Sequence, residues 1–219
     1  MSYYPIAVDL KDRNVLVVGG GTVALRKVET LLEFGARVTV VAPEVAPDIE
    51  RLAESGRIEL RRRAYERGDA AGPVLVVAAT DDRAVNSRVS EDSRSANVLV
   101  NVVDDPELCT FIVPATVKRG DLVIGISTSG KSPALARRVR EKIEEAIGPE
   151  YGELADLLGE MRELVKPRVE SQQAREEIFR KMLDSEIPDL LRQGRRADAR
   201  TLALDILDGG VEPRKGGRA

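Results

Sequence analysis

The sequence predicts an α/β fold, in which a doubly wound parallel sheet is followed by a small α+β module and a helical C-terminal region. Three observations lead to this fold class. Short β-branched apolar runs alternate with segments of helical period over residues 1–112, as in sheets covered by helices on both faces. A segment with a polar turn and a helix-start signal follows over residues 113–148, and residues 149–219 are largely helical in pattern and rich in Glu, Arg and Leu. We therefore expect three domains with these boundaries.

The first domain begins with a predicted strand, helix and strand. The run Asn14–Val18 is apolar and stops at three glycines, residues 22–34 carry apolar side chains at helical spacing, and Arg37–Val41 is a second apolar run. Such a unit forms a parallel pair of strands with a right-handed crossover. The same reasoning predicts strands at 58–60, 74–78 and 98–102 and a helix at 82–96.

The second and third domains are predicted from turn and cap signals. Apolar runs at Thr110–Pro114 and Asp121–Ile126 predict an antiparallel pair around a turn at Lys118–Asp121. Ser132 suits the N-cap of the next helix, and Pro133 suits its first position. Beyond it we expect further helices, with breaks at Pro167, Pro188 and Gly194 and a loose tail over 209–219.

A glycine-rich turn follows the first predicted strand. Gly19, Gly21 and Ala24 fit the pattern G-x-G-x-x-A, which supplies a tight turn, close approach of the backbone to a pyrophosphate and close helix packing. The N-terminus of the following helix then presents unpaired N–H groups to the phosphates. The sequence therefore favours a Rossmann-type dinucleotide-binding domain, and the alternative is a tight turn that binds no nucleotide.

The residues after the second and fourth strands bear on the cofactor. The acidic residue expected to bind the adenosine ribose at the end of the second strand is absent, and Pro43 and Glu44 follow there instead. No Arg or Lys follows directly to hold a 2′-phosphate, so we expect NAD rather than NADP. Thr80 lies at the carboxyl end of a parallel strand, where open α/β sheets bind ligands, and is either a cofactor contact or a helix cap.

Asp104 is the leading candidate for proton transfer. It follows the strand predicted at 98–102, at the ligand-binding edge of the sheet. The chain contains no histidine, so a proton acceptor must be a carboxylate, an amine or a hydroxyl group. The alternative is a solvated aspartate in a turn before proline.

Composition narrows the functional classes. The 219 residues are 42% apolar and 32% charged, with a net charge of −3, which gives no sign of nucleic-acid binding. No apolar run is long enough to span a membrane, and the N-terminus lacks the pattern of a signal peptide, so we expect a cytoplasmic protein. The single cysteine, Cys109, and the absence of Cys/His clusters argue against an internal disulfide or a metal site.

Four segments together carry a resemblance to a known family. They are Val17–Ala24, Ala79–Asp82, Asn101–Asp105 and Ile126–Ala136, and with them residues 1–165 resemble the siroheme synthase N-terminal family, the precorrin-2 dehydrogenases. The last two segments are more specific than the glycine turn, because few Rossmann-type proteins continue into a serine-rich turn capped by Ser-Pro.

The resemblance implies an NAD-dependent oxidoreductase that converts precorrin-2 to sirohydrochlorin in siroheme biosynthesis. It implies a homodimer, with a cleft for the tetrapyrrole between the nucleotide domain and the parts that follow it. Asp104 would be the catalytic residue. The NAD contacts would be made by Thr22, Val23, Pro43 and Glu44, beside the glycine turn.

The resemblance also places the substrate. The turn formed by Ser127, Thr128, Ser129 and Gly130 borders the tetrapyrrole in this family. Because the substrate carries several carboxylates, we expect cationic side chains near this turn to bind some of them. The candidates are Lys118, Arg119, Lys131, Arg137, Arg138 and Arg140.

Two alternatives stay open. A bifunctional enzyme would also insert ferrous iron into sirohydrochlorin, with Asp104 assisting the loss of the pyrrole protons. A non-catalytic, NAD-sensing regulatory domain would share the glycine turn and the sheet, but it would have no evident use for the segments Asn101–Asp105 and Ser129–Pro133.

Overall fold

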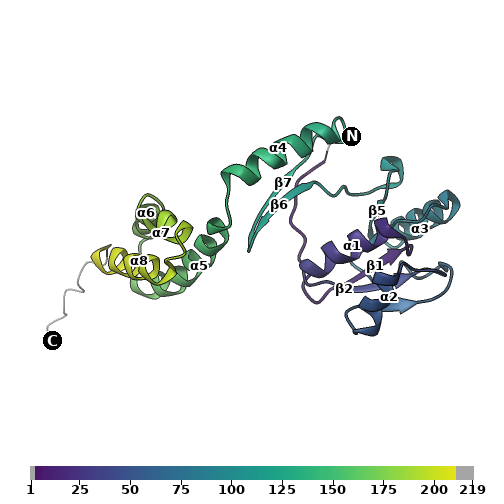
Figure 1. Cartoon of the computed structure of the whole chain (residues 1–219), viewed down its shortest axis with the longest axis horizontal. Coiled ribbons are helices and arrows are strands. Elements are labelled where there is room, and N and C mark those ends of the chain that lie inside the picture. Colours follow the sequence, from purple (N-terminus) through teal and green to yellow (C-terminus); the bar gives the residue numbers. More distant parts are fainter. Residues whose placement is uncertain (1–2, 211–219) are drawn as a thin grey trace. The chain divides into compact units, whose positions relative to one another are not determined.

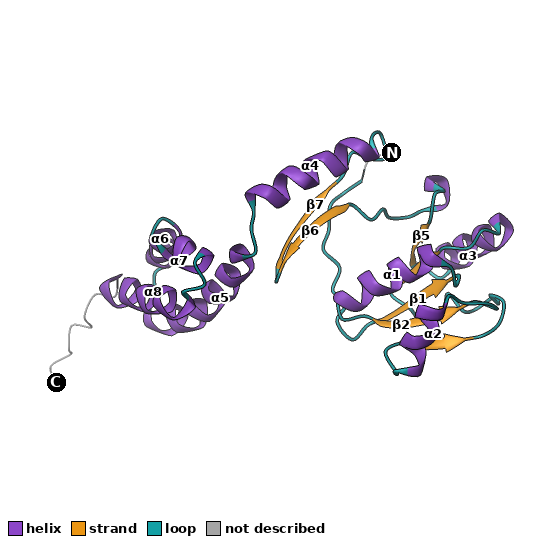
Figure 2. Cartoon of the chain, viewed as in Figure 1, coloured by secondary structure: helices purple, strands orange, loops and turns teal. Residues whose placement is uncertain are grey.

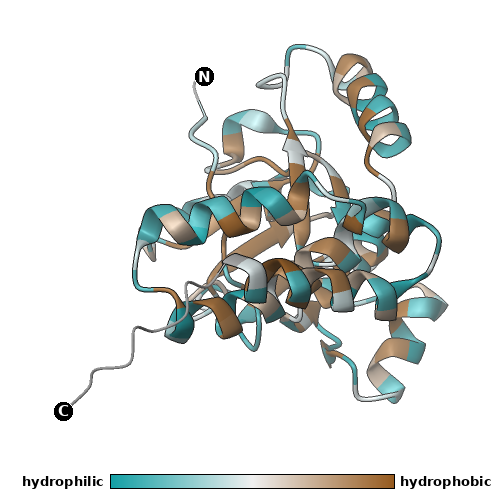
Figure 3. Ribbon diagram, turned by 90° about the vertical axis from the view of Figure 1, so that its left-hand side faces the viewer, coloured by the Kyte–Doolittle hydropathy of each residue, from teal (hydrophilic) through white to brown (hydrophobic). Residues whose placement is uncertain are grey.

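The computed structural model describes residues 3–210, which fall into two compact units (Figure 1). Of the described residues, 3–113 make up the first unit and 114–210 the second. Each unit holds its own hydrophobic clusters within the described residues. Apolar and polar residues alternate along the helices, drawn in brown and teal in Figure 3, as expected for helices with one buried face.

Five parallel strands form the sheet of the first unit, in the order β3-β2-β1-β4-β5. The strands are drawn in orange in Figure 2. The strands are β1 (Asn14–Val18), β2 (Arg37–Val41), β3 (Glu59–Arg61), β4 (Leu75–Ala78) and β5 (Leu99–Val102). Because β1 pairs with both β2 and β4, the chain winds outward on both sides of β1. The switch point therefore lies at the carboxyl ends of β1 and β4, where such sheets bind ligands.

Helices cover both faces of this sheet. They are α1 (Thr22–Glu33), α2 (Pro47–Glu54) and α3 (Arg83–Ser95). Val28 of α1 and Ile49 of α2 share a buried cluster with Val17, whereas Val89 of α3 shares the other cluster with Val18. Neighbouring residues of β1 thus enter opposite cores, as a strand buried on both faces requires, and the expected doubly wound α/β fold is confirmed.

We compared the strands and helices of this unit that were both predicted and observed. In each of them, the predicted first and last residues differ from the observed ones by at most one residue. The strand predicted at Thr110–Pro114 is wrong. The Thr110 N–H donates to the Val100 carbonyl at 2.8 Å, and the Thr110 hydroxyl accepts from the Val100 N–H at 2.8 Å. These bonds hold the segment as a loop against β5, and the next strand begins only after Pro114, which has no N–H to donate.

A β-hairpin and a helix open the second unit. β6 (Ala115–Arg119) pairs antiparallel with β7 (Leu122–Ile126) around a tight turn at Gly120. α4 (Pro133–Ala146) follows, and the hydroxyl of its N-cap Ser132 accepts a first-turn N–H at 3.2 Å. The predicted cap and first helical residue are therefore both confirmed.

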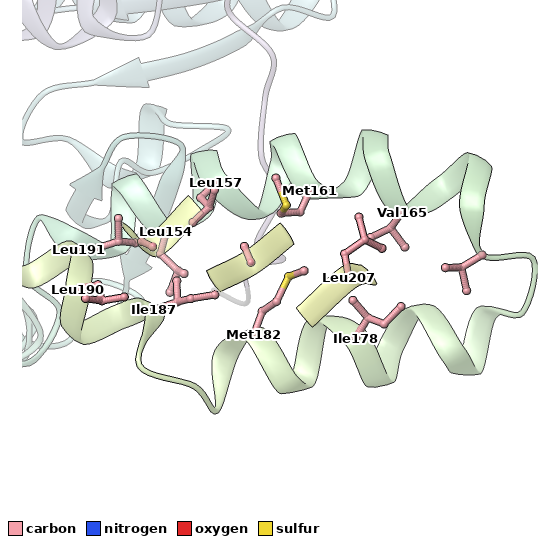
Figure 4. Close-up of a cluster of buried hydrophobic side chains, with 13 residues drawn as sticks. Leu154, Leu157, Met161, Val165, Ile178, Met182, Ile187, Leu190, Leu191 and Leu207 are labelled. Carbon is pink, nitrogen blue, oxygen red and sulfur yellow. The ribbon is translucent and has the colours of Figure 1, made fainter. Parts of the chain in front are cut away.

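The rest of the second unit is helical. The helices are α5 (Glu150–Arg168), α6 (Gln172–Leu183), α7 (Ile187–Arg192) and α8 (Arg196–Gly210). Their buried side chains form one cluster that includes Leu157, Met161 and Met182 (Figure 4). Pro188 is the second residue of α7 instead of a break between two helices, since a missing N–H in the first turn breaks no helical bond. Pro167 lies in the last turn of α5.

The end of the chain departs in part from its prediction. Gly209 and Gly210, expected in the loose tail, are the last residues of α8, and the remainder of that tail, 211–219, lies outside the described residues. Among residues 3–210, no helix combines the length and the apolar character needed to cross a bilayer.

Candidate functional site

The glycine turn between β1 and α1 packs against the end of β4. Gly19 has a φ of +123°, and a Cβ there would lie 2.7 Å from the Ala79 carbonyl carbon and overlap its oxygen. A Cβ at Gly20 would overlap the Glu44 carbonyl oxygen and lie 2.9 Å from the Val45 Cα. Both positions therefore require glycine for packing, whatever the turn binds.

Gly21 has a different environment. Its φ is −82°, and a Cβ there would meet no atom within 4 Å. Gly21 is the N-cap of α1, so the helix has no side-chain cap, and its first turn contains no acidic residue. Thr22 and Val23 are both exposed. An uncapped helix N-terminus beside open space is suited to an anionic group such as a pyrophosphate.

Pro43 and Glu44 are exposed and lie next to the glycine turn. The Ala46 N–H donates to the Gly20 carbonyl at 2.7 Å, which fixes the segment after β2 against the turn. Glu44 therefore supplies a carboxylate at the end of β2, where an acidic side chain can accept hydrogen bonds from a ribose.

Thr80, at the end of β4, is interlocked with Asn86 of α3. The Thr80 hydroxyl donates to Asn86 Oδ1 at 2.9 Å, and Asn86 Nδ2 donates to the Thr80 carbonyl at 2.9 Å. The alternative of Thr80 as a helix cap is wrong, because the carboxylate of Asp82 accepts the first-turn N–H groups of α3. Thr80 and the buried Asn86 instead fix the turn that leads from the sheet into α3.

Asp104 lies exposed in the loop after β5, with a φ of +60°. Such a conformation is uncommon for a residue with a side chain and often occurs at functional sites. The loop is held by Cys109, whose Sγ accepts from the Val102 N–H at 3.1 Å and donates to the Asp105 carbonyl at 3.3 Å. Burial raises the pKa of the Cys109 thiol, so it remains a neutral structural donor.

Asp104 lines an open cleft of about 730 Å³ within the first unit. Its walls come from the turn after β4, the start of α3 and the 3-10 helix η1 (Pro106–Leu108). They comprise Asp81, Arg83, Asn86, Val103, Asp104, Asp105, Pro106 and Glu107. Arg83 pairs with Asp105, whereas Asp104 makes no ion pair within residues 3–210, and a carboxylate without a partner can accept a proton.

The serine-rich turn belongs to the second unit, between β7 and α4. The Thr128 hydroxyl donates to the Ser132 carbonyl at 3.1 Å and accepts from the Ser132 N–H at 3.0 Å. Ser127 Oγ accepts from the Ser129 N–H at 3.0 Å, and Ser129 has a φ of +53°. Thr128 therefore holds the turn together, while Ser127, Ser129 and Gly130 are exposed.

Most of the basic side chains expected to bind substrate already have partners. Arg119 donates to carbonyl groups at the end of α4. Arg137 and Arg138 contact Glu141 at 3.1 Å and 3.6 Å, and Arg140 makes an equivalent pair one turn further on. Arg119 thus has a structural role, and the helix-surface arginines are balanced by carboxylates on the same helix.

The predicted cofactor residues and Asp104 meet at one edge of the first unit, the carboxyl ends of its strands. The predicted substrate residues, with the exposed Lys131, lie in the second unit. Sequence reasoning missed Asn86 and Arg83. An asparagine inside a predicted helix, where it is a poor helix former, was an available signal for Asn86, whereas Arg83 looks like any solvated charge. No group of three metal-ligating side chains occurs among the described residues.

Comparison with protein families gives three matches along the chain. A family described as NAD(P)-binding matches residues 6–115, which is half of the chain. A family described as sirohaem biosynthesis protein central matches residues 119–146. A third, described as sirohaem synthase dimerisation region, matches residues 150–207.

Known proteins agree with these matches. The chain is 42% identical to siroheme synthase of Methylococcus capsulatus over 208 residues and 42% identical to that of Pseudomonas aeruginosa over 211 residues. These regions cover 95% and 96% of this chain but 44% and 45% of those proteins, so the chain spans less than half of their length. A solved structure of SirC, precorrin-2 dehydrogenase, matches with a TM-score of 0.73 and 30% identity, covering 94% of this chain and 100% of that one.

These findings confirm the Rossmann-type domain and its NAD(P)-binding class. The structural match extends over both units and over the full length of the solved relative. The chain therefore belongs to the siroheme synthase N-terminal family, that of the precorrin-2 dehydrogenases.

Proposed function

We propose that the chain catalyses the NAD-dependent oxidation of precorrin-2 to sirohydrochlorin. The reaction removes a hydride and a proton from the reduced macrocycle, and the hydride reduces NAD⁺ to NADH. One observation carries the proposal. Asp104, a carboxylate without an ion pair among the described residues, lines a cleft at the carboxyl ends of the strands, and the glycine turn lies at this same edge of the sheet. Identity of 30% to a precorrin-2 dehydrogenase over that protein's full length supports the choice of substrate.

The residues at the glycine turn fit a dinucleotide. The open space at Gly21 and the N-terminus of α1, which has no side-chain cap, would hold the pyrophosphate, with the N–H groups of Thr22 and Val23 as donors. Glu44 would accept the ribose hydroxyls. When bound, NAD supplies the hydride acceptor. The chain's own contribution is to hold the dinucleotide and the macrocycle in a productive geometry.

Asp104 is proposed to take up the proton that the macrocycle loses. Its loop is fixed by the bonds of Cys109, so the backbone that carries this side chain is held in place before substrate binds. An exposed carboxylate can pass the proton on to water, which restores the residue for the next turnover. With no histidine in the chain, this carboxylate performs the role that histidine has in many enzymes.

The test is a steady-state assay of NADH formation from precorrin-2 and NAD, with Asp104→Asn as the variant. Asparagine keeps the shape of the side chain and tolerates positive φ. We expect kcat to fall by about 100-fold or more, because a positioned base contributes that much, while the Kd of NADH stays unchanged.

Asp81→Asn is the matched control, because Asp81 lines the same cleft and loses the same charge. It should retain most of the activity. Absence of NADH formation by the wild type would overturn the dehydrogenase proposal, and wild-type turnover by Asp104→Asn would overturn the role of that residue.

Insertion of ferrous iron into sirohydrochlorin is a second candidate activity. It is favoured by the relatives named siroheme synthase, which are 42% identical to this chain. Asp104 would then accept the pyrrole protons that leave when the metal enters. Addition of ferrous iron to sirohydrochlorin in the same cuvette tests this, since a spectral change that requires the wild-type protein shows insertion and an unchanged spectrum excludes it.

A cytoplasmic homodimer is part of the same proposal. Helices α5 to α8 coincide with the region that matches a sirohaem synthase dimerisation family. In the second unit, the proposed substrate contacts remain Ser127, Thr128, Ser129, Gly130, Lys131 and Arg137. Sedimentation equilibrium of the purified chain measures the assembly, and a monomer at micromolar concentration would contradict it.

A further inference from the structure

The cleft that contains Asp104 holds more negative than positive charge. Asp81, Asp104, Asp105 and Glu107 contribute carboxylates, and Arg83 is the one cationic residue among its lining residues in the described part of the chain. A tetrapyrrole with carboxylate side chains would be repelled there unless a cation met one of them. The binding of such a ligand in the cleft therefore depends on which carboxylate the Arg83 guanidinium pairs with.

Arg83 is held only loosely in the structure. Its side chain is 81% exposed, and its shortest contact to a carboxylate joins Nε to Asp105 Oδ2 at 3.4 Å. That distance exceeds the normal range for a charge-assisted hydrogen bond. An exposed pair of this kind contributes little stability, so the guanidinium can exchange one carboxylate for another at little cost.

Asp105, in contrast, is fixed by its backbone. Its carboxylate is only 22% exposed, its carbonyl accepts from the Leu108 N–H at 3.2 Å and from Cys109 Sγ at 3.3 Å, and its own N–H donates to the Val102 carbonyl at 3.4 Å. The loop therefore keeps its conformation when Arg83 moves. The pair has one fixed partner and one movable partner, and the movable partner is the cation.

We propose that Arg83 is a specificity-determining residue, whose guanidinium leaves Asp105 and pairs with a carboxylate of the tetrapyrrole bound beside Asp104. This inference rests on the proposed function. In the absence of the ligand, the ion pair with Asp105 keeps the Arg83 guanidinium at the cleft. An Arg guanidinium offers two parallel donors to a carboxylate, which orients the macrocycle relative to the proton acceptor.

The first experiment compares Arg83→Gln with Arg88→Gln in the full chain. Both residues are exposed arginines of α3, but only Arg83 lines the cleft, so the pair controls for lost charge and for helix stability. The readouts are the Kd of sirohydrochlorin by spectral titration, the Kd of NADH, and KM and kcat for precorrin-2. Circular dichroism confirms that each variant is folded.

For Arg83→Gln we expect a rise of about tenfold in the Kd of sirohydrochlorin and in the KM of precorrin-2, the size of one lost charge-assisted contact. The Kd of NADH should not change, and Arg88→Gln should behave as the wild type. Equal sirohydrochlorin affinity for Arg83→Gln and wild type overturns the inference. A change confined to NADH binding also overturns it, because Arg83 would then be a cofactor contact.

A double-mutant cycle with Asp105→Asn tests the exchange itself. If Asp105 competes with the ligand for Arg83, Asp105→Asn tightens sirohydrochlorin binding several-fold, and this gain disappears in the Arg83→Gln background. An equal gain in both backgrounds shows only reduced repulsion and overturns the exchange. Failure of the proposed function is distinguishable, because the wild type itself would then neither bind sirohydrochlorin nor form NADH from precorrin-2.

Discussion

The substitutions Gly19→Ala and Gly21→Ala, made in separate variants, distinguish a glycine that is needed for folding from a glycine that is needed for cofactor binding. At Gly19 a Cβ would lie 2.7 Å from the Ala79 carbonyl carbon, and φ is +123°. At Gly21 φ is −82°, and a Cβ meets nothing within 4 Å. The two substitutions are chemically identical and lie in one turn, so any difference between them reports on local structure.

The magnitudes follow from these two environments. At Gly19 the strained backbone costs about 1–3 kcal/mol and the overlap with β4 adds about 1–3 kcal/mol, so Gly19→Ala should lower the free energy of unfolding by about 4 kcal/mol. At Gly21 alanine is a slightly poorer N-cap than glycine. It also lowers the conformational entropy of the unfolded chain, which stabilises the folded state by about 0.4–1 kcal/mol. The net change in stability should therefore stay within about 0.5 kcal/mol.

Cofactor binding should show the opposite order. The methyl group of Gly21→Ala would occupy the space through which the backbone approaches a pyrophosphate, so we expect the Kd of NAD to rise by about 30-fold, equivalent to about 2 kcal/mol. Urea unfolding followed by circular dichroism measures stability, and titration calorimetry measures NAD binding. Wild-type NAD affinity in Gly21→Ala would refute the proposed pyrophosphate position, and a wild-type urea midpoint for Gly19→Ala would refute the packing argument.

Two further predictions concern stability. Ser93 is fully buried in α3, and its hydroxyl has no hydrogen-bond partner within residues 3–210; Ser93→Ala should therefore stabilise the protein by about 1 kcal/mol, measured by urea unfolding. Ser95→Ala is the control, because that exposed hydroxyl donates to a helix carbonyl, and a lower midpoint for Ser93→Ala would contradict the prediction. The pKa of Glu150 is lowered below its ordinary value of 4.5 by a hydrogen bond from its own N–H and by Arg192, so its stabilising effect is present above that value and is lost as the pH falls through the lowered pKa. Glu150→Gln should thus lower the urea midpoint at neutral pH but not under acid conditions, whereas Glu163→Gln, an exposed residue of the same helix, should leave it unchanged at both; a deficit of Glu150→Gln that persists in acid would disprove the linkage.

The first unit was predictable because its central strands, β1 and β4, are buried on both faces. Runs such as Val15–Val18 are continuously apolar and end at glycine or polar residues, and this pattern sets their limits. The position of Asp104 at the sheet edge follows from the strand that precedes it. The pairing of Arg137 with Glu141 was also visible in the sequence, since the two residues stand four apart in a predicted helix.

Features set by tertiary contacts were not predictable. The apolar segment at Thr110–Pro114 has the composition of a strand, but hydrogen bonds between Thr110 and Val100 hold it as a loop. The positive φ of Asp104 and the bonds of Cys109 that fix its loop leave no periodic signal. Arg83 becomes a candidate functional residue only because the fold brings several carboxylates around it.

The contact between Gly19 and Ala79 has a mechanical consequence. The chain continues from Ala79 through Thr80 to Asp81, which forms part of the cleft wall. No side chain separates the glycine turn from this segment, so thermal displacement of one is transmitted directly to the other. In the proposed reaction, hydride transfer depends on a short, steady separation between two carbon atoms, and direct contact between the proposed dinucleotide turn and the segment that forms the cleft wall limits how far that separation fluctuates.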